Sequence, residues 1–399
     1  MLIDEIFVSA LPGDRRAAAR RRGSLVRLIW DGDADGLRWG DVRLGRITAL
    51  APAIGGAFVD IGAERPGLLM REDAPPGRTL AEGEVVVVRV VRLPEGNKGA
   101  KLDARIAEEA PPPLDAAPCL IRRGDDPVVA LLRAASGPSL HHITVDDAPT
   151  LAALLKAVPQ ANGLFTLWRG ETPLFQAEGL DEEIEAVLAP HVPLRSGGRL
   201  AIEETAALVA IDVDIGGLAG ASARSAALAC NLEAAAEIGR QILLRELAGL
   251  IVVDFVPLRR PAERERVLTA LREALAGDGR RLRIGGWTRL GLLELVRERR
   301  GPSLPRQLGA RCSACAGNGF VQEARWVAGQ ALRAARAGCH TVIGGSALSV
   351  SPSVAAALRG SLAAALRDVE ARTGCPITLR ETTAVPPDGY LIEALGTGR

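Results

Sequence analysis

Three aspartates at the ends of two apolar segments are the residues of this chain best suited to chemistry. Asp212 and Asp214 follow the apolar run 208–211, and Asp254 follows the run 250–253. Oxygen ligands with no His or Cys beside them favour Mg²⁺ or Mn²⁺. A magnesium ion held by two carboxylates keeps open positions, which suit phosphodiester chemistry. Acidic residues also occur in structural networks and cap turns, so a structural role is the alternative.

Residues 208–255 predict a strand, a helix and a second strand, which together would position these aspartates. The two apolar runs are rich in β-branched residues and are typical of strands buried on both faces. Between them, five residues fall near helical spacing: Leu228, Leu232, Ala235, Gly239 and Ile242. A right-handed crossover makes the strands parallel, so both end at the same edge of the sheet. Asp212 and Asp254 therefore meet there, and Asp214 points the same way if the chain stays extended.

The composition indicates a folded protein of two or three domains. The chain has 399 residues, of which 48% are hydrophobic, enough for substantial cores. No apolar run approaches the roughly 20 residues of a membrane span, and the first residues lack the pattern of a secretory signal. Only Cys312 and Cys315 of the six cysteines are closely spaced, which argues against a disulfide framework and favours a reducing cytoplasm. The net charge of +1 says nothing about nucleic acid.

The first third of the chain predicts two strands and then a small barrel. The strands are expected at 2–11 and 23–30, and the basic segment between them, 15–22, is interpreted as a solvated face, with phosphate contact as the alternative. Residues 36–107 hold five short strands separated by Gly and Pro turns, the size of an oligonucleotide-binding fold. We expect these strands at 38–50, 56–62, 67–70, 84–93 and 101–106.

Three residues of this barrel are candidates for contact with an oligonucleotide. Lys98 and Lys101 lie on a glycine-rich loop that can follow a phosphate backbone. Phe58 is the clearest aromatic residue for stacking on a base, although a lone Phe in an alternating strand also suits a core.

The remaining segments predict a mixture of helices and strands. Helices are expected at 127–135, 150–156, 181–189, 261–275, 291–299, 324–337 and 354–372. Strands are expected at 199–203, paired with 207–213, and at 281–285, 341–345, 377–380 and 390–394. Cys339, His340 and Cys375 are interpreted as structural.

Cys312 and Cys315 form a CxxC pair followed by glycines, which indicates half of a zinc site. Zinc in a structural site takes four ligands, and the sequence has no second CxxC or His cluster. The same half from a second subunit could complete the site across a two-fold axis. The alternative is a pair of spare thiols.

These features together resemble the ribonuclease E/G family, over most of the chain. The matching segments are 57–65 and 96–100 in the barrel, 170–175, the turn 196–198, and the long run 231–255. The CxxC pair resembles the zinc-link that joins two protomers of that family.

The resemblance implies a multidomain α+β and α/β fold. An RNase H-like part is interrupted by an S1 barrel of the oligonucleotide-binding type, and is followed by a DNase I-like catalytic part and a small C-terminal α/β domain. The boundaries we assign are 1–35 for the first RNase H-like part, 36–107 for the barrel, 108–200 for the linker and remaining RNase H-like part, 201–310 for the catalytic part, 311–320 for the zinc-link and 321–399 for the last domain.

The resemblance also implies a magnesium-dependent endoribonuclease that cleaves single-stranded RNA in the processing or decay of rRNA or mRNA. Asp212 and Asp254 fall on the metal-binding aspartates, and Asp214 falls where the family usually has an asparagine. Phe58 and Lys98 fall on S1 positions that hold RNA. The zinc-link implies a homodimer or a larger oligomer.

Departures from the family pattern leave an alternative function open. The loop 215–221 differs and is shorter, and Leu68 stands where the barrel often has a second aromatic residue. No segment matches the Arg-Thr motif that senses a 5′-monophosphate, so we expect end sensing to be lost. The alternative is an RNA-binding regulator on an inactive nuclease scaffold. A metal-dependent phosphatase ranks last because it leaves the barrel without a purpose.

Overall fold

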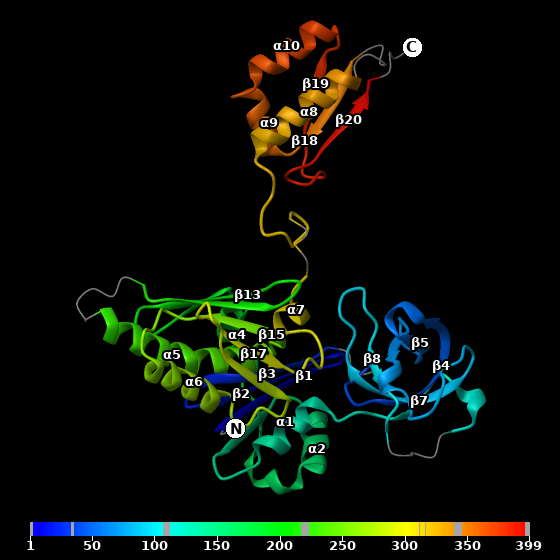
Figure 1. Cartoon of the computed structure of the whole chain (residues 1–399), viewed down its shortest axis with the longest axis vertical. Coiled ribbons are helices and arrows are strands. Elements are labelled where there is room, and N and C mark those ends of the chain that lie inside the picture. The colour runs from blue at the N-terminus through cyan, green and yellow to red at the C-terminus, as the bar shows by residue number, and fades with distance from the viewer. Residues whose placement is uncertain are drawn as a thin grey trace. The chain divides into compact units, whose positions relative to one another are not determined.

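The computed structural model describes residues 3–32, 36–106, 112–216, 223–310, 312–315, 317–338 and 345–395. The chain divides into two compact units, Met1–Leu308 and Gly309–Arg399, which are described separately (Figure 1). The mixed α+β class expected from the sequence is confirmed. No helix of the described part of the chain is long and apolar enough to cross a membrane. The finer boundaries within Met1–Leu308 stay predictions.

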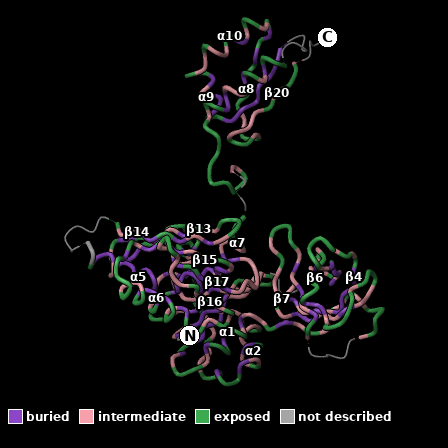
Figure 2. The backbone as a smooth tube through the Cα atoms, viewed as in Figure 1, coloured by how far each residue is buried: buried purple, intermediate pink, exposed green. Residues whose placement is uncertain are grey.

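The first sheet has the strand order β11–β10–β1–β2–β3. Its strands are β1 (Glu5–Leu11), β2 (Asp14–Arg21), β3 (Ser24–Asp31), β10 (His142–Val145) and β11 (Phe165–Leu167). One face packs on helices α1 (Pro127–Ala135) and α2 (Ala148–Ala157). The other face packs on α3 (Leu174–Ala177), α4 (Leu180–Leu188), α5 (Ala223–Leu244) and α7 (Leu304–Leu308). The sheet is therefore covered on both sides, and Figure 2 colours every described residue by how far it is buried.

The basic segment 15–22 forms most of strand β2, and its interpretation as a solvated face holds only at Arg21 and Arg22, which are exposed. Its middle residues, Ala17 to Ala19, are fully buried. Arg16 pairs with Asp181 at 3.3 Å and lies 4.5 Å from the ring centre of Phe175. Arg16 and Arg20 thus bind α3 and α4 to the sheet.

The expected barrel is confirmed as a closed ring of five strands. Hydrogen bonds join β4, β5, β6, β8 and β7 and return to β4, and β9 adds to β4. The strands are β4 (Val42–Ala51), β5 (Gly56–Asp60), β6 (Gly67–Met70), β7 (Val85–Arg92), β8 (Lys101–Asp103) and β9 (Cys119–Arg122). Single-turn 3₁₀ helices lie at Pro52–Ile54, Arg71–Asp73 and Leu114–Ala116, and a longer one at Pro159–Leu164.

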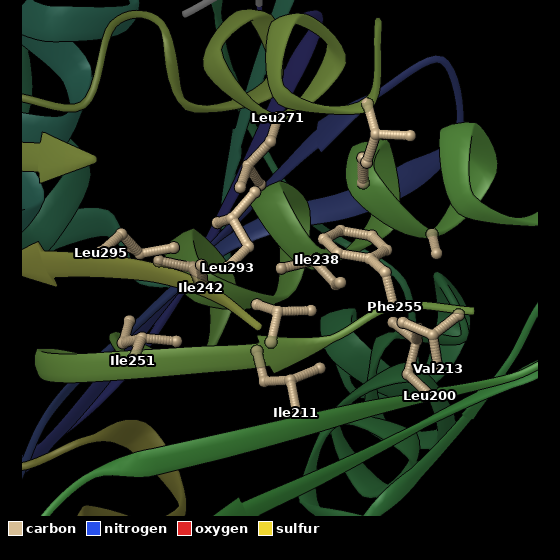
Figure 3. Close-up of a cluster of buried hydrophobic side chains, with 14 of the residues drawn as sticks. Leu200, Ile211, Val213, Ile238, Ile242, Ile251, Phe255, Leu271, Leu293 and Leu295 are labelled. Carbon is tan, nitrogen blue, oxygen red and sulfur yellow. The ribbon is translucent and has the colours of Figure 1, made fainter. Parts of the chain in front are cut away.

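The second large sheet has the order β12–β13–β14–β15–β17–β16. Its strands are β12 (His191–Pro193), β13 (Arg199–Glu204), β14 (Val209–Asp214), β15 (Gly249–Asp254), β16 (Leu282–Trp287) and β17 (Leu293–Arg297). Helices α5 and α6 (Pro261–Leu275) cover one face. Figure 3 shows side chains that meet in this core: Ile211, Val213, Ile251 and Leu293 from the strands, Ile238 and Ile242 from α5, and Leu271 from α6.

Two predictions about this sheet are corrected by the structure. Its central strands are buried on one face only, because Leu250 and Val296 on the opposite face are 39% and 49% exposed. Segment 291–299 forms strand β17 instead of a helix, since its burial alternates with a period of two residues. We call the face opposite α5 and α6, which carries these exposed residues, the open face.

The second unit contains a three-stranded sheet with helices packed against it. The sheet order is β19–β18–β20, from β18 (Ser346–Val350), β19 (Ile377–Glu381) and β20 (Tyr390–Ala394). Helix α8 (Ala324–Gly338) agrees with the prediction, whereas the helix expected at 354–372 is two helices, α9 (Pro352–Arg359) and α10 (Ala363–Thr373), because Gly360 leaves the helical conformation. Residues 339–344 lie outside the described residues. They include Cys339, His340 and all but the last residue of the strand expected at 341–345. Cys375 is buried.

Candidate metal and RNA-binding site

Asp212 and Asp254 are direct partners on neighbouring strands. Strands β14 and β15 are parallel, and their register pairs Asp212 with Asp254. Register partners point to the same side of a sheet, here the open face, and both residues are exposed. Among the described residues, neither carboxylate has a hydrogen-bond or ion-pair partner. The expected convergence of these two carboxylates is therefore what the register produces.

The burial of the alternate residues fixes this register. Ile211 and Val253, each one residue before an aspartate, are in the core against α5 and α6. A slip by one residue would turn these side chains to the open face and the aspartates into the core. Phe255 anchors the chain just after Asp254, since it is buried and packs on Trp287 with ring centres 5.6 Å apart.

Asp214 lies on the same face but is bound by a cation. Its Oδ2 forms an ion pair with Nη2 of Arg199 at 3.0 Å, and its Oδ1 accepts a hydrogen bond from the Gly216 amide at 2.9 Å. Within the described part of the chain, no group of three His, Cys, Asp or Glu residues is arranged to hold a metal ion. The structure therefore gives a pair of unpartnered carboxylates with a third, neutralised carboxylate beside it.

Glycines allow the turn 196–198 to approach the end of β14. A Cβ atom on Gly198 would lie 2.6 Å from the Asp214 carbonyl oxygen, and one on Gly216 would lie 2.5 Å from the Gly197 carbonyl oxygen. Glu233 of α5 also holds this turn, because it accepts the amides of Arg195 and Ser196. Of the altered loop 215–221, residues 217–221 lie outside the described residues.

Phe58 is on the outer surface of the barrel, not in its core. It is 38% exposed, whereas its neighbours Ala57 and Val59 are fully buried. Strand register places Phe58 opposite Leu68, and Leu68 opposite Lys101. These three residues form a row across the outside of β5, β6 and β8. Such a row is the kind of surface that single-stranded nucleic acids contact.

The two loop lysines differ in their surroundings. Lys98 is exposed, and its backbone pairs with Glu95. The Lys101 ammonium instead pairs with Asp73 at 2.9 Å. The loop is also held to the segment after β17 and to α7, because the Glu95 carboxylate binds Arg299 and Arg306 at 3.2 and 2.5 Å.

Backbone amides surround the Cys315 thiol in the CxxC segment. The pKa of Cys315 is lowered, first by hydrogen bonding from the amides of Gly319 and Gly317, and also by Cys312 and the amide of Asn318. Donors that stabilise a thiolate fit a zinc ligand, because zinc binds the deprotonated sulfur. Two sulfurs supply half of a tetrahedral set.

Comparison with known proteins decides the family. The sequence model of the ribonuclease E/G family matches residues 98–300, half of the chain. The chain belongs to the ribonuclease E/G family. It is 29% identical to ribonuclease E of Nostoc sp., over 71% of this chain and 54% of that protein. It is 26% identical to ribonuclease G of Escherichia coli, over 93% of this chain and 95% of that protein.

Ribonuclease E of Escherichia coli is 29% identical over 70% of this chain, and the match covers 35% of that longer protein. The chain thus spans 54% of one ribonuclease E and 35% of the other. The alignment with ribonuclease G runs over 465 positions, more than the 399 residues of the chain. That relative therefore has segments that this chain lacks. The predicted enzyme class, endoribonuclease, is the class of this family.

Sequence reasoning missed two residues near this candidate site. Asn231 of α5 is fully buried and clamps the chain after Asp254, because its side chain both donates to and accepts from the Val256 backbone, at 2.8 and 3.1 Å. A lone amide on an apolar helix face was the available signal. Glu294 lies on the open face opposite Val252, and it was missed because its strand was predicted to be a helix.

Proposed function

We propose that this chain is a magnesium-dependent endoribonuclease that cleaves single-stranded RNA on the open face of the six-stranded sheet. The observation that carries the proposal is the in-register pair Asp212 and Asp254, exposed and without partners among the described residues, in a chain of the ribonuclease E/G family. Two unpaired carboxylates side by side repel each other, and a divalent cation between them removes that repulsion.

Asp212 and Asp254 would hold Mg²⁺ or Mn²⁺ through their carboxylate oxygens, and Asp214 would support the same site. When bound, such an ion polarises the scissile phosphate and lowers the pKa of a water. In-line attack of a water on the phosphorus would break the bond to the 3′ oxygen, which takes up a proton, and would leave a 5′-phosphate and a 3′-hydroxyl. The protein's own contribution is to keep these oxygens in place. The buried Ile211 and Val253, next to the two aspartates, and the Asn231 hydrogen bonds to Val256 do so.

The barrel would hold the RNA strand upstream of the cleaved bond. Phe58 offers a ring for base stacking, and Lys98 offers an ammonium for a phosphate. We assign Lys101 a supporting role, because its ammonium pairs with Asp73. Binding at a distance from the reacting phosphate positions the strand and lowers the entropic cost of reaction.

Cys312 and Cys315 would share one zinc ion with the same residues of a second copy, which makes the protein a homodimer or a larger assembly. The chain would act in the cytoplasm on rRNA or mRNA, without sensing a 5′-monophosphate. An RNA-binding regulator without activity is the alternative, and the following experiment separates the two.

A cleavage gel tests the proposal. A 5′-labelled AU-rich RNA should be cut in Mg²⁺ and left intact in EDTA, at equal rates for monophosphate and hydroxyl 5′ ends. Asp254→Asn should abolish cleavage and keep RNA binding. Asp368→Asn, an exposed aspartate of α10 in the second unit, is the matched control and should cut normally. RNA binding without cleavage by the unaltered protein would favour the regulator.

A further inference from the structure

The ion pair between Arg199 and Asp214 lies beside the carboxylate pair on the open face. Arg199 is the register partner of Asp214, and Ala201 is the partner of Asp212. One strand spacing of about 4.8 Å and two residues of about 3.4 Å each put the Arg199 backbone roughly 8 Å from that of Asp212. An arginine side chain can span much of that distance, so its guanidinium lies within reach of the same phosphate region.

Arg199 has unused hydrogen-bonding capacity. Its guanidinium carries five N–H donors, and within the described part of the chain its one contact is the ion pair from Nη2 to the Asp214 carboxylate. The Arg199 side chain is 61% exposed and that of Asp214 is 42% exposed. The carboxylate thus fixes one edge of the guanidinium and leaves the other edge open to solvent.

The charges of this region favour a role with phosphate. Asp212, Asp214, Asp254 and Arg199 together carry two net negative charges, which one divalent cation neutralises. Without Arg199 this group of residues would keep a net negative charge after the cation binds, and it would repel the RNA backbone.

We infer that Arg199 is a phosphate-binding residue of the catalytic face, held in position by Asp214. Its free N–H donors contact a non-bridging phosphate oxygen of the RNA strand next to Asp212 and Asp254. This inference rests on the proposed ribonuclease function, because it places RNA on the open face. This contact differs from those of the barrel, since Arg199 would bind the RNA next to the phosphate that is cleaved.

The salt dependence of RNA binding tests this contact. Affinity for an AU-rich RNA in EDTA, where no cleavage occurs, is measured by fluorescence anisotropy at several KCl concentrations. Arg199→Gln should weaken binding and reduce the slope of log affinity against log salt by about 0.7, the value for one lost phosphate contact on a single strand. Arg199→Lys should keep most of the slope, because the charge remains.

Arg272→Gln is the matched control. Arg272 lies on α6, on the other side of the sheet, is 52% exposed, and pairs with one carboxylate, that of Glu265. Its replacement should leave both affinity and slope unchanged. An equal loss of slope in this control would overturn the inference in favour of a general effect of surface charge.

Metal affinity gives a second readout that a folding defect would not imitate. Arg199→Gln removes a positive charge near the carboxylates, so Mn²⁺ measured by electron paramagnetic resonance should bind several-fold more tightly while RNA binds more weakly. A parallel loss of both affinities, or no change in either, would overturn the inference. If Asp254→Asn stops cleavage and Arg199→Gln changes nothing, the nuclease stands and the phosphate contact fails. If the protein never cleaves RNA but Arg199→Gln reduces the salt slope, the phosphate contact stands and the nuclease proposal fails.

Discussion

Arg297 and Asp278 form a two-point ion pair from which water is almost excluded. The Arg297 Nε and Nη2 atoms lie 2.6 and 3.0 Å from the two Asp278 carboxylate oxygens. The two side chains are 0% and 2% exposed, and Nη1 of Arg297 also donates to the Leu247 carbonyl at 2.8 Å. The pair fixes the end of β17 against the turn after α6, behind the open face.

Asp278→Asn should destabilise the unit Met1–Leu308. The substitution leaves the Arg297 charge buried without its main partner, and loss of one member of a buried pair costs about 3–5 kcal/mol. Glu246, 3.8 Å from Arg297, will offset part of that cost. Urea unfolding followed by tryptophan fluorescence measures the change, and the exposed Asp368→Asn variant should show little. Equal stability of the two variants would contradict the prediction.

Acid should remove this stabilisation over a defined range of pH. Burial by itself raises the pKa of Asp278, but hydrogen bonds and the positive charge of Arg297, with further charge from Arg27 and Arg280, more than offset it and lower the pKa. A lowered folded-state pKa stabilises the protein above the unfolded value of about 3.9, and the contribution is lost as the pH falls through the folded value. The unfolding free energy should therefore decrease below about pH 4 more steeply in the unaltered protein than in Asp278→Asn. Parallel pH profiles would refute this.

The central crossover could be predicted because it depends on local patterns. The apolar runs, the helical spacing between them and the handedness of the connection place Asp212 opposite Asp254 without any long-range information. The barrel was predictable for the same reason, since short strands and glycine turns define it. Segment 291–299 was not, because adjacent leucines satisfy both a helical and an alternating pattern.

Contacts between distant segments could not be read from the sequence. The partners of Arg16 and Asp214 come from α4 and β13, so nothing near them in the chain distinguishes a bound charge from a solvated one. The exposure of Phe58 and the ion pair of Lys101 could not be predicted for the same reason. The first depends on the closure of the barrel and the second on Asp73, and neither depends on adjacent residues in the sequence.

Phe58→Ala should weaken RNA binding in EDTA. Loss of base–aromatic stacking costs about 1–3 kcal/mol for each base, and Phe58 is exposed, so its removal leaves no large cavity. Leu120→Ala is the matched control, because Leu120 is a similarly exposed apolar residue, 42%, on β9 of the same barrel. A Phe58 variant that binds RNA as tightly as the Leu120 variant would exclude the stacking role.

Lys98→Gln and Lys101→Gln should have different effects. Lys98 is exposed, so its loss should reduce RNA affinity and its salt dependence by one phosphate contact without affecting stability. Lys101 pairs with Asp73, which is 10% exposed, so its loss should lower the thermal stability and change RNA affinity less. Thermal unfolding and anisotropy on both variants make the comparison. The opposite assignment of effects would show that Lys101, and not Lys98, holds the strand.

Cys315 should react as a thiolate in the metal-free protein and be protected by zinc. The amides of Gly319 and Gly317 lower its pKa, so at neutral pH more of it is ionised than for an ordinary thiol, and the thiolate is the reactive form. Iodoacetamide followed by peptide mass spectrometry should modify Cys315 before the half-buried Cys119, and added zinc should reverse that order. Metal analysis should give about half a zinc per chain, as expected when two CxxC pairs complete one tetrahedral site. Cys315→Ser should release the metal and convert the dimer to a monomer by sedimentation. A zinc-free monomer whose Cys315 reacts equally with and without the metal would eliminate the shared site.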